Sequence, residues 1–234
     1  MNRFRKMSIY AVCALALFLS ASMPLPIAKS ASGPIPNLVA YYPFDGNALD
    51  LSGNEKHGTI ADAVVAADRF GKNGGALFLD GRNDFINFPI NINPKDMPQL
   101  TVTMWCQPEG QQRDVHLITH DNGSYDRTIA INDTDKGRTF SLFQGNRKRF
   151  EAPRRTTSNE WIFVAMVYNE ETQEASIWIN NTKHRSFGSL GWGFHSLRVG
   201  INVHSMQFFR GAIDEMQVYH RALNDDEVRR IRTG

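Results

Sequence analysis

Short apolar runs separated by turn residues recur along most of the chain, and this pattern constrains the fold more than any other feature. Runs such as GALFLD, QLTVTMWCQP, TFSLF and EASIWIN are only a few residues long, and Gly, Asn and Asp lie between them. A high density of short strands with turn signals between them is typical of an all-β sandwich. We therefore predict an all-β fold in which two antiparallel sheets pack face to face.

Only the C-terminal end of the chain has helical character. Asn224 and Glu227 have the spacing of a capping box. The run DDEVRRIR places acidic residues first and arginines last, as the helix dipole favours. We predict one short helix around residues 224 to 232.

Alternation along a strand assigns its side chains to the two faces of a sheet. In QLTVTMWCQP, Cys106 shares the apolar face, which indicates a small core residue rather than a reactive thiol. Trp105 and Trp178 lie on the opposite, polar faces of their strands. The run WIFVAMVY is apolar on both faces, which indicates a central strand that is covered on both sides.

The chain begins with the pattern of a secretory signal peptide. A basic stretch precedes the mostly apolar residues 7–19, which are too few to span a bilayer. Small residues favour cleavage after Ser30, and an uncleaved amphipathic anchor is the alternative. We predict a signal peptide at residues 1–30, a short linker at 31–37 and one domain at 38–234. The protein is then secreted, extracellular or periplasmic, without a membrane span.

Charge and cysteine content narrow the function classes. Residues 1–30 hold four of the 26 Lys and Arg residues and none of the 24 Asp and Glu residues, so the rest of the chain has 22 basic and 24 acidic residues and a formal charge of −2. This balance gives no case for nucleic-acid binding. Cys106 is the one cysteine left after cleavage, so no intrachain disulfide can form and core burial must stabilise the domain.

Several landmarks in one order carry a resemblance to a known family. They are LVAYYPFDGNALDLSGNEKHGTI, ADRFGKNGGALFLDGRNDFINFP, LTVTMWCQP, NEWIFVAMVYNEETQEASIWINN and FRGAIDEMQVYHRALNDDEV. Over nearly all of residues 38–228 the sequence resembles the laminin-G-like jelly-roll domains of the concanavalin A-like lectin/glucanase superfamily. Two departures are Asn181, where the family commonly has an Asn-Gly turn, and the long basic segment QGNRKRFEAPRRTT.

The resemblance implies a two-sheet antiparallel jelly-roll sandwich that is usually extracellular. It also implies a module that often binds glycan or protein and frequently carries a structural calcium ion. It implies no fixed ligand, because this fold hosts unrelated functions.

The most specific metal hypothesis joins the two ends of the domain. Strand alternation places Asp214 with Ala212, Met216 and Val218 on an apolar face, where a carboxylate needs a compensating partner. Ca²⁺ takes six to eight oxygen ligands. We predict that it is held by Asp45, Asp50, Asn54 and Asp214. The alternative is that the Asp and Asn residues of 45–54 only form turns.

Tryptophan is the natural candidate for sugar binding, because an exposed aromatic ring can cover the apolar side of a pyranose. Trp105 and Trp178 stand on polar faces, and Trp192 lies between two glycines in a loop. Trp192 is the best candidate of the three. The alternative for all three is burial beneath long loops.

One basic cluster stands out from the rest of the chain. It contains Arg147, Lys148, Arg149, Arg154 and Arg155. Arginine side chains match sulfate and carboxylate groups, so Arg147 and Arg149 are candidates for contact with an anionic polysaccharide. A solvated hairpin is the alternative.

Catalysis is not predicted. A glycanase needs two carboxylates that face one cleft, whereas the adjacent Asp214 and Glu215 point to opposite faces of a strand. The sequence also lacks a zinc motif, a nucleophile elbow and a phosphate-binding loop. We expect a secreted, non-catalytic module that binds carbohydrate and has a structural calcium ion. The alternative is an adhesive or structural module that binds only a cell-surface or extracellular protein.

Overall fold

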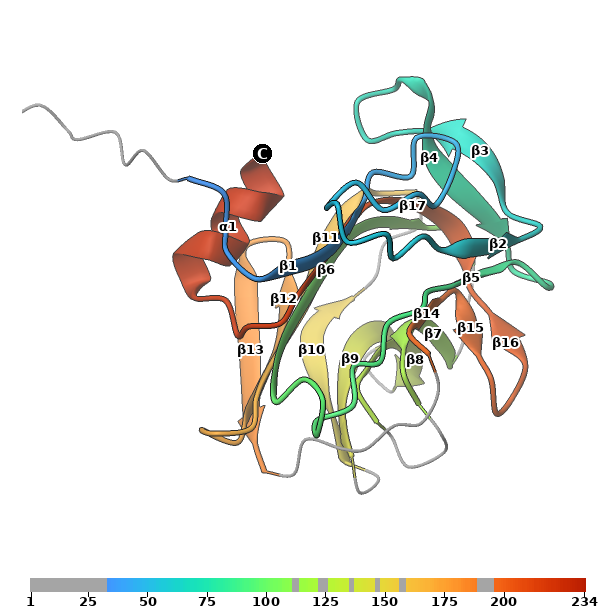
Figure 1. Ribbon diagram of the computed structural model, residues 1–234. Coiled ribbons are helices and arrows are strands. Elements are labelled where there is room, and N and C mark those ends of the chain that lie inside the picture. The colour runs from blue at the N-terminus through green and yellow to red at the C-terminus, as the bar shows by residue number, and fades with distance from the viewer. Residues whose placement is uncertain are drawn as a thin grey trace, which may run out of the picture. The chain divides into compact units, whose positions relative to one another are not determined.

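Two antiparallel sheets pack face to face in the computed structural model (Figure 1). The described residues are 33–110, 114–121, 126–134, 137–145, 148–155, 159–188 and 196–234. All of them except Gly33 belong to a unit that spans Pro34–Gly234. The predicted signal peptide lies outside the described residues, so it stays a prediction. Within the described part of the chain, no helix is long and apolar enough to cross a membrane.

Sheet A is the larger of the two sheets. Its strands are β1 (Leu38–Tyr42), β3 (Val64–Ala67), β4 (Asn73–Asp80), β6 (Gln99–Pro108), β11 (Ile162–Asn169), β12 (Glu174–Ile179), β13 (Thr182–Phe187) and β17 (Arg210–Tyr219). They are ordered β13-β12-β11-β6-β17-β4-β3, and β1 also pairs with β17. The strands β13 and β3 therefore form opposite edges of the sheet.

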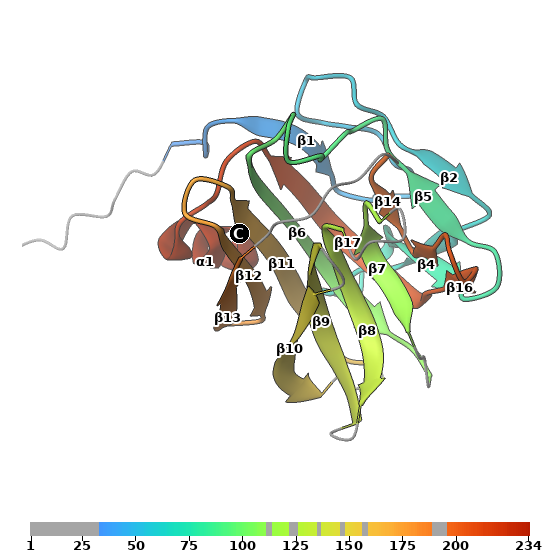
Figure 2. The same cartoon turned by 90° about the horizontal axis from the view of Figure 1, so that it is seen from below.

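Sheet B lies below sheet A in Figure 1 and faces the viewer in Figure 2. Its strands are β2 (Thr59–Ala61), β5 (Phe85–Asn87), β7 (Val115–Thr119), β8 (Thr128–Thr134), β9 (Gly137–Gly145), β10 (Lys148–Arg155) and β14 (Arg198–Val199). Their order is β10-β9-β8-β7-β14-β5-β2. Two further strands, β15 (Ile201–Asn202) and β16 (Gln207–Phe208), form a hairpin. The predicted two-sheet antiparallel sandwich is confirmed.

The main core lies between the sheets and follows the predicted alternation. Met104 and Cys106 of β6 and Ile177 of β12 are fully buried there. Cys106 is a free cysteine, and burial raises the pKa of its thiol well above the usual range. The interpretation of Cys106 as a small core residue is confirmed.

A second core lies on the outer face of sheet A, where the helix α1 (Asp225–Thr233) packs. Its buried residues include Phe163, Trp178 and Val228. The strand β11 therefore has apolar contacts on both faces, as its sequence predicted. Figures 1 and 2 both show α1 beside β12 and β13.

The capping box that the sequence predicted is present at the start of α1. The Asn224 side chain accepts hydrogen bonds from the backbone N–H groups of Asp226 and Glu227, both at 3.0 Å. The Glu227 carboxylate in turn accepts from the backbone N–H of Asn224 at 2.9 Å. These bonds satisfy backbone donors that a helix start would otherwise leave unpaired.

A β-bulge in β17 changes the face on which Asp214 lies. Pairing with β6 shifts register between Asp214 and Gln217, and Glu215 there has a φ of 52°. Asp214 lies opposite Trp105 on the outer face, whereas Met216 is fully buried in the main core. The prediction that Asp214 shares a face with Met216 and Val218 is therefore wrong, because the extra residue of a bulge reverses the alternation.

The outer face of sheet B carries buried polar side chains. The His116 Nδ1 atom lies 3.2 Å from Thr119 Oγ1. The Asn132 side chain donates to Asp114 Oδ1 at 2.9 Å and accepts a hydrogen bond from the Ser141 hydroxyl. Burial lowers the pKa of His116 to about 4, so its ring stays neutral near pH 7. Side-chain hydrogen bonds hold this face together, and no helix among the described elements packs on it, whereas α1 packs on sheet A.

Candidate functional site

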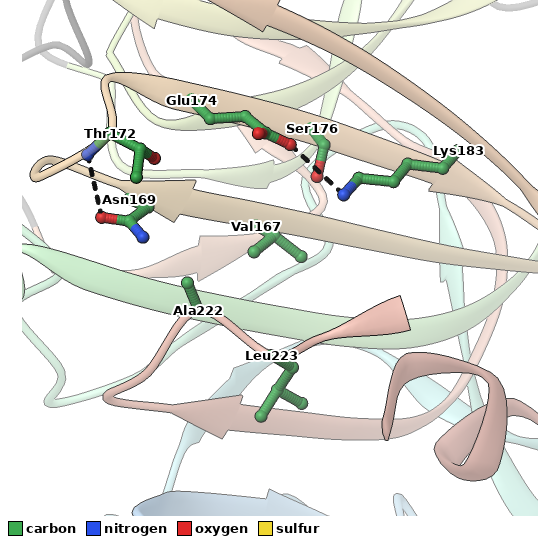
Figure 3. A pocket seen from close by; sticks show the side chains of 8 residues that line it. All are labelled: Val167, Asn169, Thr172, Glu174, Ser176, Lys183, Ala222 and Leu223. Atoms are coloured by element: carbon green, nitrogen blue, oxygen red, sulfur yellow. Dashed lines mark hydrogen bonds and ion pairs between the residues drawn. The ribbon is translucent and has the colours of Figure 1, made fainter. Parts of the chain in front are cut away.

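A pocket of about 210 Å³ lies on the outer face of sheet A, beside the segment that leads into α1 (Figure 3). Its polar lining residues are Asn169, Thr172, Glu174, Ser176 and Lys183, and its apolar lining residues are Val167, Ala222 and Leu223. The strands β11, β12 and β13 supply most of these side chains. The pocket therefore combines an apolar surface with several hydrogen-bonding groups.

Lys183 links three elements at this pocket. Its Nζ atom lies 3.2 Å from Glu174 Oε1 on β12 and 3.1 Å from Asp225 Oδ1 at the start of α1. Arg185 Nη1 approaches Glu174 Oε2 at 4.0 Å. Arg229 of α1 also lies 3.9 Å from Asp225 Oδ2. Each of these charged groups therefore has a partner of opposite sign.

Asn169 presents a fixed amide group to the pocket. Its Oδ1 atom accepts hydrogen bonds from the backbone N–H groups of Glu171 at 3.0 Å and Thr172 at 3.3 Å. These bonds orient the side chain, and no described residue accepts a hydrogen bond from its NH₂ group. The amide is thus a preoriented donor for a ligand.

An exposed aromatic ring flanks the pocket. Alternation along β13 places Lys183, Arg185 and Phe187 on one face, and Phe187 lies opposite Glu174 in the pairing of β12 with β13. Phe187 is 59% exposed. An exposed ring beside convergent polar groups is the combination that suits the apolar and hydroxyl-bearing sides of a sugar.

The arrangement suits binding rather than bond cleavage. Glycoside hydrolysis uses two carboxylic groups that flank the scissile bond, one of them as a proton donor. The two carboxylates here, Glu174 and Asp225, contact the same Lys183 ammonium group. That contact holds both carboxylates against one ammonium group, so they do not flank a space in which a scissile bond could lie.

Of the tryptophans predicted to bind sugar, the two in the described part of the chain, Trp105 and Trp178, do not line this pocket. Trp178 is only 1% exposed, and Arg229 of α1 lies over its ring at 5.3 Å from the centroid. The expectation that Trp178 is available for stacking is therefore wrong, because α1 covers the polar-looking face of β12. Trp105 is half-buried, edge-on to Phe163, and Arg69 lies 5.2 Å from its ring centroid. Trp192 lies outside the described residues.

The basic cluster is only partly described. Arg149 is exposed on β10 and lies opposite Phe143 of β9, on the outer face of sheet B. It is therefore on the other sheet from the pocket. Arg147 lies outside the described residues.

Asp214 has a basic partner that the sequence interpretation missed. Arg69 Nη1 lies 2.7 Å from Asp214 Oδ2 and 3.9 Å from Glu215 Oε1. Asp214 is 2% exposed, and burial raises the pKa of its carboxyl to about 6 even though Arg69 acts to lower it. The inference that Asp214 needs a compensating partner was sound, and Arg69 supplies the positive charge.

The other predicted calcium ligands have separate partners. Asp50 accepts hydrogen bonds from the backbone N–H groups of Tyr41 at 2.9 Å, Ser52 at 2.8 Å and Lys56 at 2.9 Å. Burial acts to raise the pKa of Asp50, but these hydrogen bonds outweigh it and lower that pKa below its usual value. Asp50 therefore holds a turn together, as the alternative interpretation proposed.

Asn54 and Asp45 also point to other groups. The Asn54 amide donates to the carbonyls of Leu38 at 3.0 Å and Val39 at 3.1 Å, and Asp45 pairs with Lys72 at 2.8 Å. Among the described residues, no group of three or more His, Cys, Asp or Glu side chains could hold a metal ion. Each of the four predicted ligands thus has its own partner within the protein, and calcium binding by these residues stays a prediction.

The sequence interpretation missed Glu174, Lys183 and Phe187. The alternation of TKHRSF carries a signal, because it places Lys183, Arg185 and Phe187 on one face. That face becomes part of a candidate site only because β13 is an edge strand that lies beside α1. The position depends on tertiary packing, which the local pattern does not contain.

A family model described as the concanavalin A-like lectin/glucanases superfamily matches residues 80–229. Comparison with curated proteins returned no match. Among solved structures, the chain is similar to domain 4 of AbnA, an extracellular arabinanase from Geobacillus stearothermophilus, in complex with arabinotriose. The TM-score is 0.64 at 20% identity, over 83% of this chain and 98% of that domain.

The chain is also similar to binding domains of larger toxins. For the binding domain of Paraclostridial Mosquitocidal Protein 1 the TM-score is 0.63 at 20% identity, over 84% of this chain and 52% of that one. For the binding domain of botulinum neurotoxin DC in complex with SialylT it is 0.63 at 12% identity, over 85% and 51%. This chain thus spans about half of each toxin domain, and the likeness shows a shared fold.

Proposed function

This chain belongs to the concanavalin A-like lectin/glucanase superfamily, and from that premise we propose that it is a secreted, non-catalytic module that binds carbohydrate. The observation that carries the proposal is the pocket on the outer face of sheet A. Exposed Phe187 flanks it, and Asn169, Glu174 and Lys183 supply hydrogen-bonding groups. We assign sugar binding to this pocket.

The comparisons support a binding role. The similar AbnA domain was solved with arabinotriose and the similar toxin domain with SialylT, and both belong to larger proteins. The balanced charges of the pocket agree with an uncharged ligand. The pairing of Glu174 in the pocket and Asp225 beside it with the same Lys183 supports a role without catalysis.

The area of the Phe187 ring that a sugar can cover determines how much affinity its removal should cost. A sugar ring that covers roughly 50 Å² of the exposed phenyl ring would gain about 1.3 kcal/mol. A loss of that size changes the dissociation constant by roughly tenfold.

The test is a glycan array probed with three proteins. Wild type should bind a defined set of glycans, and Phe187→Ala should lose most of that signal. The matched control is Phe70→Ala, which removes a 77% exposed ring in the turn between β3 and β4, at the edge of sheet A opposite β13. The control should bind like wild type. Equal binding by wild type and Phe187→Ala would reject the pocket as the sugar site.

Protein binding is the second candidate function. Val64 and Val65 on the edge strand β3 are 57% and 60% exposed, and Phe70 nearby in the chain is also exposed. The similar toxin domain was also solved in complex with rat synaptotagmin II. If protein is the ligand, Val65→Lys should abolish binding on an array of extracellular proteins. Phe187→Ala should then leave that binding unchanged.

Secretion has its own test. The signal peptide at residues 1–30 predicts that the exported protein begins at Ala31, because cleavage after Ser30 is favoured. Mass spectrometry of the N-terminal peptide checks this. Cell-associated protein that retains residue 1 would contradict it.

A further inference from the structure

We infer that the outer-face pocket holds a single sugar residue at the end of a neutral glycan chain and does not bind along the middle of a chain. This inference rests on the proposed function and names the part of the glycan that the site recognises. Three features of the pocket carry it: its size, its boundaries and its charge balance.

The size of the pocket fits one ring. Its volume is about 210 Å³. Pockets for drug-sized ligands are usually about 300 to 1,000 Å³. A single monosaccharide unit is smaller than such a ligand, whereas two or three linked units are not. The second unit of a chain must therefore lie outside the pocket.

The boundaries leave one natural exit. The strands β11 and β12 contribute Val167 and Ser176, Thr172 bounds the pocket at the 170–173 turn, and Ala222 and Leu223 bound it on the side of α1 (Figure 3). The strand β13 is the edge of sheet A, so no further strand of that sheet in the described part of the chain lies beyond it. A chain that leaves the pocket therefore passes over β13.

Phe187 lies on that exit. It shares a face of β13 with Lys183, which lines the pocket, and it lies opposite Glu174 on β12. Arg185 lies over the Phe187 ring at 5.8 Å from its centroid. We expect the part of the ring that stays exposed to contact the second sugar unit, while the first unit occupies the pocket. A long chain could not continue in both directions, because the turn at Thr172 and the segment at Ala222 bound the pocket elsewhere.

The charge balance selects neutral sugars. An anionic sugar would approach the carboxylates of Glu174 and Asp225, and a cationic sugar would approach Lys183 and Arg185. Each of these charged groups already has a partner of opposite sign within 4.0 Å. Hydroxyl groups can share hydrogen bonds with such pairs without leaving a charge uncompensated.

Titration calorimetry with a length series tests the inference. The probes are neutral chains of arabinose, xylose, glucose and galactose, each from one to six units, added to the full chain. We expect at least one series to bind, with a gain of about tenfold from one unit to two and a change within about twofold from two units to six. Phe187→Ala should remove the gain from the second unit and leave monosaccharide binding unchanged.

Arg82→Ala is the matched control, because Arg82 is exposed in the turn between β4 and β5, away from β11 to β13, and it should titrate like wild type. Affinity that keeps rising from two units to six would overturn recognition of a chain end and leave the proposed function standing. Binding of anionic glycans alone would overturn the choice of neutral sugars. If no glycan binds either here or on the array, both the inference and the proposed function fail.

Discussion

The outer faces of the two sheets are built in opposite ways. On sheet A, the helix α1 covers apolar residues such as Trp178 and Phe163 and makes a second core. On sheet B, the corresponding face carries His116, Asn132 and Ser141, which are buried and joined to their neighbours by hydrogen bonds. One sandwich thus uses apolar packing on one outer face and a polar network on the other.

This difference explains where the pocket forms. A helix that covers only part of a sheet leaves a step where its cover ends, and the pocket lies beside Ala222 and Leu223, which lead into α1. Lys183 of β13 joins the sheet to the helix here, because its ammonium group contacts Asp225 of α1. The second core therefore stabilises the fold and also shapes the candidate sugar site.

Removal of the largest side chain of the second core should have the largest effect on stability. Trp178 is 1% exposed and lies under Arg229, so Trp178→Ala should lower the free energy of unfolding by about 3 to 5 kcal/mol. Urea denaturation measures this change. Phe187→Ala on the same sheet face should cost less than about 0.5 kcal/mol, because its ring is exposed. Similar losses of stability for the two variants would mean that Trp178 does not lie in a buried core beneath α1.

The two outer faces should respond to pH in opposite directions. The pKa of Asp214 is raised from 3.8 to about 6, so between these values the folded state binds more protons than the unfolded state, and stability falls as pH rises. The pKa of His116 is lowered from 6.5 to about 4, so in that range the unfolded state binds more protons, and stability rises with pH.

Two variants separate these contributions. Asp214→Asn should make the slope of unfolding free energy against pH more positive between pH 4 and 6, and His116→Asn should make it more negative. Each change is at most about 1.4 kcal/mol per pH unit. Urea titrations at pH 4, 5 and 6 measure the slopes. Shifts of the same sign in both variants would contradict the burial of these two groups.

The helix cap should have a smaller effect. Asn224 accepts two backbone hydrogen bonds at the start of α1, so Asn224→Ala should lower the free energy of unfolding by about 1 kcal/mol. Asn224→Asp keeps the acceptor and serves as the control, with most of the stability retained. If both substitutions cost the same, the loss does not come from the cap.

Chelation should have the smallest effect. Arg69 compensates Asp214, and backbone N–H groups compensate Asp50. We therefore expect EDTA to leave the melting temperature of protein purified with calcium unchanged. A fall that added calcium reverses would instead support the calcium site predicted from Asp45, Asp50, Asn54 and Asp214.

Local patterns were enough to predict much of the fold. Cys106 lies in the core because alternation in β6 is regular, and the Asn224 capping box forms because its hydrogen bonds are local. Asp214 was placed on the wrong face because the bulge at Glu215 leaves no clear mark in the sequence. Its partner Arg69 is 145 residues away in the chain, a distance that no local pattern bridges.

The candidate site was harder to predict than the fold. Trp178 stands on a face with polar neighbours, yet α1 covers it, and only the packing of that helix shows this. Phe187 is exposed because β13 is an edge strand. Both facts depend on which elements become neighbours, so composition and alternation could not distinguish the buried ring from the exposed one.

The most direct test of the account is to map a bound glycan by NMR. Addition of the glycan with the strongest array signal to isotope-labelled protein should shift the amide resonances of Asn169, Glu174, Lys183 and Phe187. The resonances of β7 to β10 on sheet B should stay in place. Shifts confined to His116, Asn132, Ser141 and their neighbours, with none at the pocket, would contradict the claim that the pocket beside α1 binds carbohydrate.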